Sequence, residues 1–341
     1  MTVNIFDTYT MLEALEIMFP LRTFLTDLFF KDVRNSTTEF IQLDISSESR
    51  RLAEFVAPEQ QGKLVEKTTW TTKTVKAPYI KMKTSTNASQ ILKRQMGQTI
   101  YAGNASPAQR AQEELGKDLA MLRNMIIRRI EYMAAQVFLT GKVTGDGEGI
   151  DFEVDYGLPA SHDIAVGTIT AWNNAISDPF GDIEDWAELI EKDSGKTPSV
   201  CIMGVDAARA FRNADSVKEL LDNRRIVMGE LKLSLLPSGA RFLGTIGDID
   251  FYSYSAFYQD SAGAIQRVFP SKELILASTD VRSVLHYGAI EDLEYDGNFA
   301  VPFFPKSWMT KDPSKQWLMV QSAPLPAHYE PNSWVHAEVL A

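Results

Sequence analysis

A single apolar stripe over residues 106–141 constrains the fold of this chain more than any other feature of its sequence. Apolar residues recur there at steps of three and four, which predicts one continuous helix. Ser106, Pro107 and Gln109 form an N-terminal capping pattern, and Gly141 is placed to end the helix. The residues expected to face a core are Leu115, Leu119, Leu122, Ile126, Ile130, Met133 and Val137.

The length of this helix predicts an elongated molecule. A helix of 34 residues spans about 51 Å, and a compact globule of 341 residues would itself be only about 50 Å across. The helix would therefore act as a spine. A coiled coil is the alternative, but the apolar spacings of 4, 4, 3, 4, 4, 3 and 4 lie closer to an 11-residue repeat than to heptads, which counts against a left-handed coiled coil.

Residues 59–97 have the composition of strands without the apolar content of a core. Only 12 of these 39 residues are apolar, and 8 are Lys or Arg against 2 acids. The segment predicts a long two-stranded hairpin, which is marginal alone in water and needs another surface to lie on. We expect its apolar residues to gain partners only on assembly. The candidate contact residues are Lys63, Lys67, Trp70, Lys73, Val75, Lys76, Tyr79, Ile80 and Lys81.

Charge is unevenly distributed along the chain. Residues 1–61 carry a net charge of −5, residues 62–142 carry +9, and residues 143–341 carry −15, for a total of −11. A basic middle segment is typical of contact with nucleic acid or with an acidic surface, including one on another copy of the chain. A solvated charged face explains the same pattern, and the sequence leaves these alternatives open.

The remaining segments indicate a globular protein of mixed structure. A hydrophobic fraction of 45% and a charged fraction of 23% exclude disorder, and no apolar run is long enough to span a bilayer. The first residues are acidic, so we expect no signal peptide, and one cysteine suits a reducing cytoplasm. Residues 178–290 alternate helix and strand patterns, and residues 286–341 combine strand patterns with several prolines.

The sequence predicts no catalytic, cofactor-binding or metal-binding residues. Ser194-Gly195-Lys196-Thr197 resembles the end of a phosphate-binding loop but lacks the first glycine of that motif. Cys201 lies in an apolar run typical of a buried strand. The four histidines are dispersed and match no metalloprotease spacing, so we expect no enzyme.

A set of short segments follows in order from about residue 20 to the C-terminus. They are Leu28-Phe29-Phe30-Lys31, Thr38-Glu39, Pro78-Tyr79-Ile80-Lys81, Asp178-Pro179, Asp182-Ile183-Glu184, Val217-Lys218-Glu219, Leu221-Asp222, Arg224-Arg225, Gly247-Asp248-Ile249, Tyr287-Gly288, Ile290, Asp292, Pro305-Lys306-Ser307-Trp308, Asp312-Pro313 and Gln321-Ser322-Ala323-Pro324-Leu325. No single segment is diagnostic, but in this collinear order they resemble the lambda-type major capsid (head) proteins of tailed bacteriophages, which have the Hong Kong 97 fold.

The resemblance implies an α+β fold with five parts. These are an N-terminal arm and the start of a peripheral domain (1–58), an extended hairpin loop (59–97), the peripheral domain with its spine helix (98–171), an axial domain (172–285) and C-terminal strands of the peripheral domain (286–341). It also implies that the extended loop lies across a neighbouring subunit.

The resemblance further implies a major capsid protein that self-assembles into hexamers and pentamers of an icosahedral head. That head would enclose double-stranded DNA without sequence-specific binding, mature from a procapsid to an expanded shell, and assemble in the bacterial host cytoplasm. The implied partners are a separate scaffolding protein, a portal and a decoration protein at three-fold sites, with no membrane and no cofactor.

Three alternatives remain at this point. A phage tail or baseplate protein would also oligomerise through an arm, but into rings or tubes. An enzyme with an α/β catalytic domain would need convergent polar groups around one pocket. A DNA-binding module accounts only for the basic middle, and the net charge of −11 argues against it.

Overall fold

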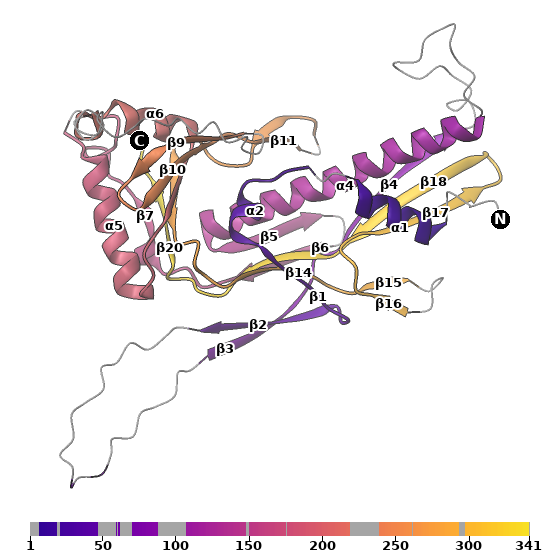
Figure 1. Ribbon diagram of the computed structural model, residues 1–341, viewed down its shortest axis with the longest axis horizontal. Helices are drawn as coiled ribbons and strands as arrows, with labels where there is room; N and C mark the ends of the chain where they lie inside the picture. The colour runs from indigo at the N-terminus through magenta and orange to yellow at the C-terminus, as the bar shows by residue number, and fades with distance from the viewer. Residues whose placement is uncertain are drawn as a thin grey trace, which may run out of the picture.

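The computed structural model is elongated, with a six-stranded sheet at one end and a long helix running toward the other (Figure 1). It describes residues 7–18, 21–46, 59, 61, 70–87, 107–147, 150–174, 176–218, 239–260, 262–292 and 297–340. The helices are α1 (Thr8–Ile17), α2 (Leu25–Phe29), α4 (Pro107–Thr140), α5 (Pro179–Ser194) and α6 (Val205–Asn213), with a 3-10 turn η1 (Ala160–His162).

Helix α4 is the spine of the molecule. It covers 34 residues and ends at Gly141, whose φ of +66° is a left-handed conformation that suits glycine. The Gly141 amide donates to the Val137 carbonyl at 3.0 Å. All seven residues expected to face the core are buried, whereas Ser106 and the Gln109 side chain lie outside the described residues.

Several small sheets pack along α4 and together form what we call the spine body. Leu318 and Val320 on β18 are buried in its core, and α4 contacts β18 and β4 directly. The strands, sheet by sheet, are β17 (Phe304–Thr310), β18 (Lys315–Ser322) and β4 (Ile80–Asn87); β1 (Asp32–Asn35), β14 (Ser283–Tyr287) and β19 (Pro324–His328); β5 (Lys142–Gly147) and β6 (Ile150–Asp155); β15 (Ile290–Asp292) and β16 (Gly297–Phe299).

A six-stranded sheet with helices α5 and α6 forms the sheet body, which has a second buried core. Asp178 caps α5 by accepting from the Gly181 amide at 3.3 Å, and Gly195 ends the helix at a φ of +73°. The Ser194–Thr197 run is therefore the end of a helix, not a phosphate-binding loop. The strands, in sheet order, are β7 (Asp163–Ala165), β20 (Trp334–Glu338), β13 (Glu273–Ala277), β8 (Val200–Met203), β10 (Ile249–Tyr254) and β9 (Ala240–Ile246), beside a separate hairpin of β11 (Phe257–Gln259) and β12 (Ile265–Arg267).

The predicted pairing of strands within residues 59–97 is wrong. Strand β3 (Trp70–Lys76) pairs with β2 (Phe40–Ser46) in an antiparallel hairpin, whereas β4 pairs with β18. Between β3 and β4 the chain passes through the interior, where Ala77 and Pro78 are buried. The prediction failed because residues 59–97 were treated as one unit. They contain β3, a strand of a projecting hairpin, and β4, a strand of the spine body.

The predicted assignment of strands to the two ends of the chain also differs from the structure. Strands β20 and β7, which were expected in the peripheral part, pair within the six-stranded sheet. Their residues Val335, Ala337 and Ile164 pack in the core of the sheet body. The reason is that β20 fills the gap between β13 and β7, an arrangement between distant segments that local patterns do not encode.

Substituting Ile126→Asp is expected to unfold the spine body, because Ile126 is only 1% exposed and an unpaired buried charge costs about 3–5 kcal/mol. The neighbouring Met125 on the same helix is 40% exposed, so Met125→Asp is the matched control. Thermal unfolding of the isolated subunit should show a large loss of stability for the first variant alone. Equal stability of the two variants would contradict the observed orientation of α4.

Candidate inter-subunit arm and its anchor

The β2–β3 hairpin, which we call the arm, extends away from both bodies (Figure 1). Its register runs from Phe40 opposite Lys76 to Ser46 opposite Trp70, and within the described residues this sheet consists of these two strands. One side of the arm packs on the spine body, where Ile41 and Leu43 are buried, while Phe40 at its base is half exposed. A two-stranded ribbon of this kind has little stability of its own.

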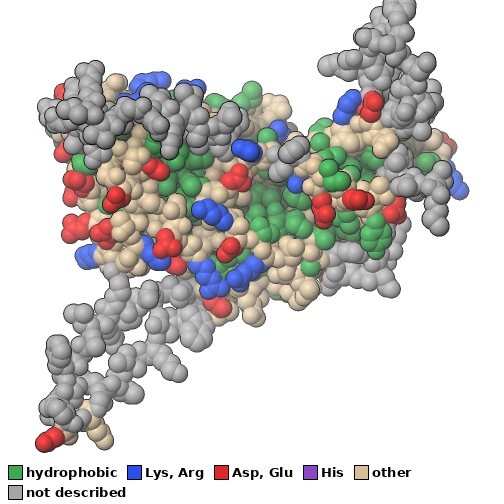
Figure 2. Space-filling view, in the orientation of Figure 1, with side chains coloured by type: hydrophobic (Ala, Val, Ile, Leu, Met, Phe, Trp, Pro, Cys, Tyr) green, Lys and Arg blue, Asp and Glu red, His purple; other side chains and the backbone are tan. Residues whose placement is uncertain are grey.

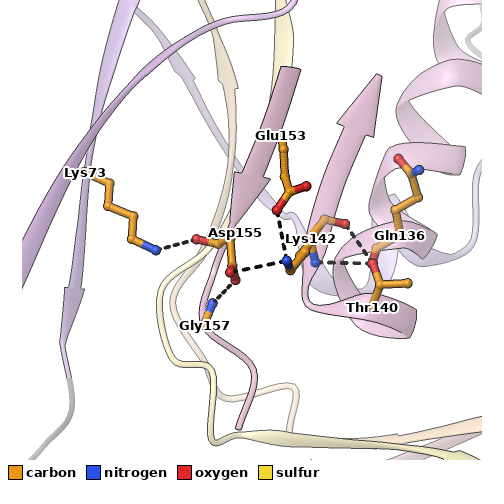
Figure 3. A network of polar contacts seen from close by, with 7 residues as sticks. All are labelled: Lys73, Gln136, Thr140, Lys142, Glu153, Asp155 and Gly157. Atoms are coloured by element: carbon orange, nitrogen blue, oxygen red, sulfur yellow. Dashed lines mark hydrogen bonds and ion pairs between the residues drawn. The ribbon is translucent and has the colours of Figure 1, made fainter. Parts of the chain in front are cut away.

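A polar network anchors the base of the arm to the end of the spine helix (Figure 3). The Lys73 ammonium on β3 donates to the Asp155 carbonyl at 2.7 Å. The Asp155 carboxylate accepts from the Gly157 amide at 2.7 Å and lies 3.6 Å from the Lys142 ammonium. Lys142 also donates to Glu153 at 2.9 Å. Because Lys142 directly follows α4 and Gly141, the network links arm and spine.

The acidic groups of this network favour the protonated form of Lys142. The hydrogen bond from Lys142 to Glu153, together with the charges of Glu153 and Asp155, raises the pKa of Lys142. The network is exposed to solvent, so its contribution to stability is small and sensitive to salt. It orients the arm rather than holding the fold together.

The predicted contact residues of the arm fall into separate groups. Lys63 and Lys67 lie outside the described residues, as does the side chain of Trp70. Lys73 is the anchor described above, and Lys76 forms an ion pair with Glu39 beside the base of the arm.

Three of the predicted contact residues have apolar partners within their own subunit, so the expectation that they gain partners only on assembly is wrong for them. Val75, Tyr79 and Ile80 pack against the core of the spine body. The Tyr79 hydroxyl donates to Gln321 at 2.8 Å, and burial together with nearby acidic groups raises the pKa of Tyr79 to about 12. Lys81 lies 4.8 Å from the centre of the Tyr79 ring. Tyr79 and Ile80 belong to the body that carries the arm, and Val75 packs β3 of the arm against that body.

A buried carboxylate that the sequence interpretation missed joins the two bodies. Glu131 on α4 is 4% exposed. Its oxygens accept from the amides of Phe24, Leu25 and Thr26 at 2.8–3.0 Å and from the Thr26 hydroxyl at 2.6 Å. They also accept from the Tyr254 hydroxyl on β10 at 2.7 Å. The sequence contained a sign of this role, because Glu131 lies between Ile130 and Met133 of the apolar stripe. An acidic side chain buried there needs hydrogen-bond donors.

Two further features fix the N-terminal segment and Tyr254. The Arg123 guanidinium donates to the Leu15 and Met18 carbonyls, both at 2.8 Å, and so holds the end of α1 against the spine. Burial and the charge of Glu131 raise the pKa of Tyr254, so this hydroxyl remains a donor. Both interactions are structural.

The four histidines have partners in the structure that account for their presence. Burial lowers the pKa of His328 to about 4, and the same cause, with Arg34 and Arg282 nearby, lowers that of His286 to about 4. Burial opposes protonation of His336, but hydrogen bonds to Glu273 and Asp163 outweigh it and raise its pKa.

The remaining buried groups of chemical interest are also structural. His162 lies 2.7 Å from the Trp334 carbonyl and 3.0 Å from Asp193. Burial raises the pKa of the Cys201 thiol. Among the described residues, no group of three or more acidic, histidine or cysteine side chains could hold a metal ion, and no helix has the length and apolar character of a membrane span.

A model of the family described as phage major capsid protein E matches residues 7–339. The chain belongs to this family. It is 28% identical over 343 residues to the major capsid protein of Enterobacteria phage P21, covering 99% of this chain and 100% of the relative. It is 27% identical over 346 residues to the major capsid protein of Escherichia phage lambda, with the same coverage.

Solved structures give the same result for the fold. A crystal structure of a prophage capsid protein from Escherichia coli CFT073 matches with a TM-score of 0.74 at 24% identity, covering 98% of this chain and 99% of that chain. The capsid of Ralstonia phage GP4 matches with a TM-score of 0.56 at 13% identity, covering 95% and 93%. These likenesses confirm the expected α+β capsid fold.

The family match decides between the alternatives left open by the sequence. It confirms the resemblance to lambda-type major capsid proteins and a role in the phage head shell, over the tail or baseplate alternative. Because it spans both bodies, the sheet body is part of a structural capsid protein. Capsid proteins of this kind form the virion head by self-assembly.

Substituting Glu131→Gln should destabilise the subunit by about 2–4 kcal/mol, because an amide offers one acceptor oxygen where the carboxylate offers two and turns N–H groups toward other donors. Glu113 is exposed on the same helix, so Glu113→Gln is the control and should change stability by less than about 0.5 kcal/mol. Chemical denaturation of isolated subunits measures both. A Glu131→Gln subunit as stable as the control would contradict the role of Glu131 in joining the two bodies.

Proposed function

We propose that this chain is the shell-forming subunit of an icosahedral phage head, assembling into hexamers and pentamers around double-stranded DNA. In this proposal the spine body is the peripheral domain, the sheet body is the axial domain, and the arm is the extended loop that lies across a neighbouring subunit. The observation that carries it is the arm itself, a two-stranded hairpin that leaves its own core in a chain of the capsid family.

The physical basis of assembly is a set of weak contacts repeated around the shell. On its own subunit the arm buries Ile41 and Leu43 and packs Val75 against the same core. Burying about 600 Å² of apolar surface on a neighbour would contribute about 15 kcal/mol before the costs of association. Heterologous contacts that close into rings of five and six then complete a shell.

Charge supports this arrangement by orienting the encounter between subunits. The middle of the chain carries +9 and the C-terminal part −15, so neighbouring copies can place unlike charges together. Such attraction increases the rate of association and is screened beyond about 8 Å at physiological salt. The net charge of −11 also favours an inner wall along which DNA slides without sequence-specific binding.

Maturation and the remaining partners follow from the same proposal. The shell first forms as a procapsid on a separate scaffolding protein in the host cytoplasm, and then expands as DNA enters through a portal. During expansion the body would carry the packed strands of the arm with it, because Ile41 and Leu43 are buried in the spine body and Lys73 is bonded to the Asp155 carbonyl. A decoration protein at the three-fold sites would stabilise the expanded form.

Replacing residues 47–69 with Asn-Gly is expected to give folded subunits that form no closed shells. The design closes the hairpin directly, since Ser46 already lies opposite Trp70 and a two-residue turn joins such a pair. Electron microscopy and sedimentation of the full chain and of the shortened variant measure assembly, and thermal unfolding checks the fold. Closed shells of normal size from the shortened variant would contradict the proposed role of the arm.

A further inference from the structure

One face of the β4–β18–β17 sheet carries lysines and tryptophans. The register places Trp308 opposite Trp317 and Lys83 opposite Met319, and Lys315 lies two residues before Trp317 on the same strand. All five side chains point to the same side because side chains alternate along a strand. We call this surface, made of Lys83, Trp308, Lys315, Trp317 and Met319, the lysine–tryptophan face.

The opposite side of this sheet is covered by the subunit's own helices. Leu318 and Val320 point toward α4 and are buried, and the Thr86 hydroxyl donates to Asp118 on α4 at 3.2 Å. Helix α1 contacts both β17 and α4, so it lies on the helix side as well. The lysine–tryptophan face therefore points away from the helices, and its side chains are exposed or half-buried.

The side chains of this face are held in place by contacts with one another. The Trp308 and Trp317 rings stack with centroids 6.2 Å apart and an angle of 13° between their planes. The Lys83 and Lys315 ammonium groups lie 5.4 Å and 6.0 Å from the Trp317 ring. Such cation–π contacts keep the ammonium groups beside an apolar platform. A partner that fits must combine carboxylates with apolar side chains.

Helix α1 presents such a combination on its outer surface. Thr8, Met11 and Leu15 are buried, which turns Tyr9, Glu13, Glu16 and Ile17 outward at helical spacing. Tyr9 is 67% and Ile17 is 74% exposed. Figure 2 shows acidic and hydrophobic side chains together over α1. We call these four outward residues the α1 stripe.

The acidic residues of the α1 stripe and the lysines of the lysine–tryptophan face form no ion pairs within their own subunit, as far as the structure describes it. Throughout the described part of the chain, Glu13 and Glu16 have no ion-pair partner, and the same holds for Lys83 and Lys315. The two surfaces belong to different sides of one body, because α1 lies on the helix side of the sheet. They can therefore meet only between copies.

We propose that the lysine–tryptophan face of one subunit binds the α1 stripe of a second copy, an inference that rests on the proposed shell function and names one of its contacts. The contact is heterologous, because two different surfaces meet and each subunit uses both. Glu13 and Glu16 would lie beside Lys83 and Lys315, and Tyr9 and Ile17 would cover the indole platform.

Nucleic acid is a less suitable occupant of this face. The strength of nucleic-acid binding follows the number of phosphates neutralised, and this side of the sheet offers few ammonium groups: Lys83 and Lys315 beside Trp317, and Lys81 farther along β4 beside Tyr79. The Trp317 ring, on which a base would stack, already lies beside Trp308, Lys83 and Lys315. An acidic helix with apolar side chains can pair its carboxylates with the lysines and pack its apolar side chains on the tryptophans and Met319.

Charge reversal tests the pairing in the full chain. Lys83→Glu with Lys315→Glu should raise the concentration needed for assembly at least about tenfold, and so should Glu13→Lys with Glu16→Lys. Combining all four substitutions should restore assembly to near the wild-type concentration. The charge-preserving control, Lys83→Arg with Lys315→Arg, should assemble as the wild type does. Light scattering measures assembly, and thermal unfolding shows that each subunit is folded.

The outcomes separate this contact from the shell function. Failure of the fourfold variant to recover, while either double variant is impaired and folded, would overturn the pairing. Normal assembly of both double variants would also overturn it, and normal particles with less retained nucleic acid would assign the face to DNA instead. A wild-type chain that forms only open multimers would contradict the proposed shell. In that case, loss of multimers in the double variants and their recovery in the fourfold variant would still test this contact.

Discussion

The Glu131 carboxylate lies where the N-terminal segment, the spine helix and the six-stranded sheet meet, and it accepts five hydrogen bonds from the first and last of these. A buried charge is tolerated only when donors surround it, so each of these parts is needed to satisfy the group. The same carboxylate then fixes their relative positions. The long helix and both cores can act as one rigid subunit because this group holds them in register.

The region around Glu131 is held by buried hydrogen bonds, whereas the exposed parts of the molecule are held more weakly. The arm is a two-stranded hairpin whose base is oriented by Lys73 and by the Lys142 ion pairs, and the lysine–tryptophan face and α1 stripe are open to contact. A shell protein benefits from this division, because a stiff body defines the geometry of a ring while arms and faces supply many weak contacts. Expansion of a shell can then change how subunits meet without unfolding any of them.

The sequence predicted the parts of this structure that local periodicity determines. The stripe from Leu115 to Val137 and the stop at Gly141 predicted α4 closely, because both depend on neighbouring residues. The pairing of β3 with β2 and of β4 with β18 could not be predicted in the same way. Pairing depends on partners up to hundreds of residues away, and the strand composition of residues 59–97 fits more than one. Glu131 was missed because its donors belong to Phe24–Thr26 and Tyr254, which are far from it in sequence.

In the proposed shell, each subunit completes its packing on its neighbours through the arm. The most direct measurement is a cryo-electron microscopy map of particles assembled from the purified full-length chain. We expect closed shells in which every β2–β3 hairpin lies on an adjacent subunit. Shells or other assemblies in which each hairpin rests on its own subunit would contradict this expectation.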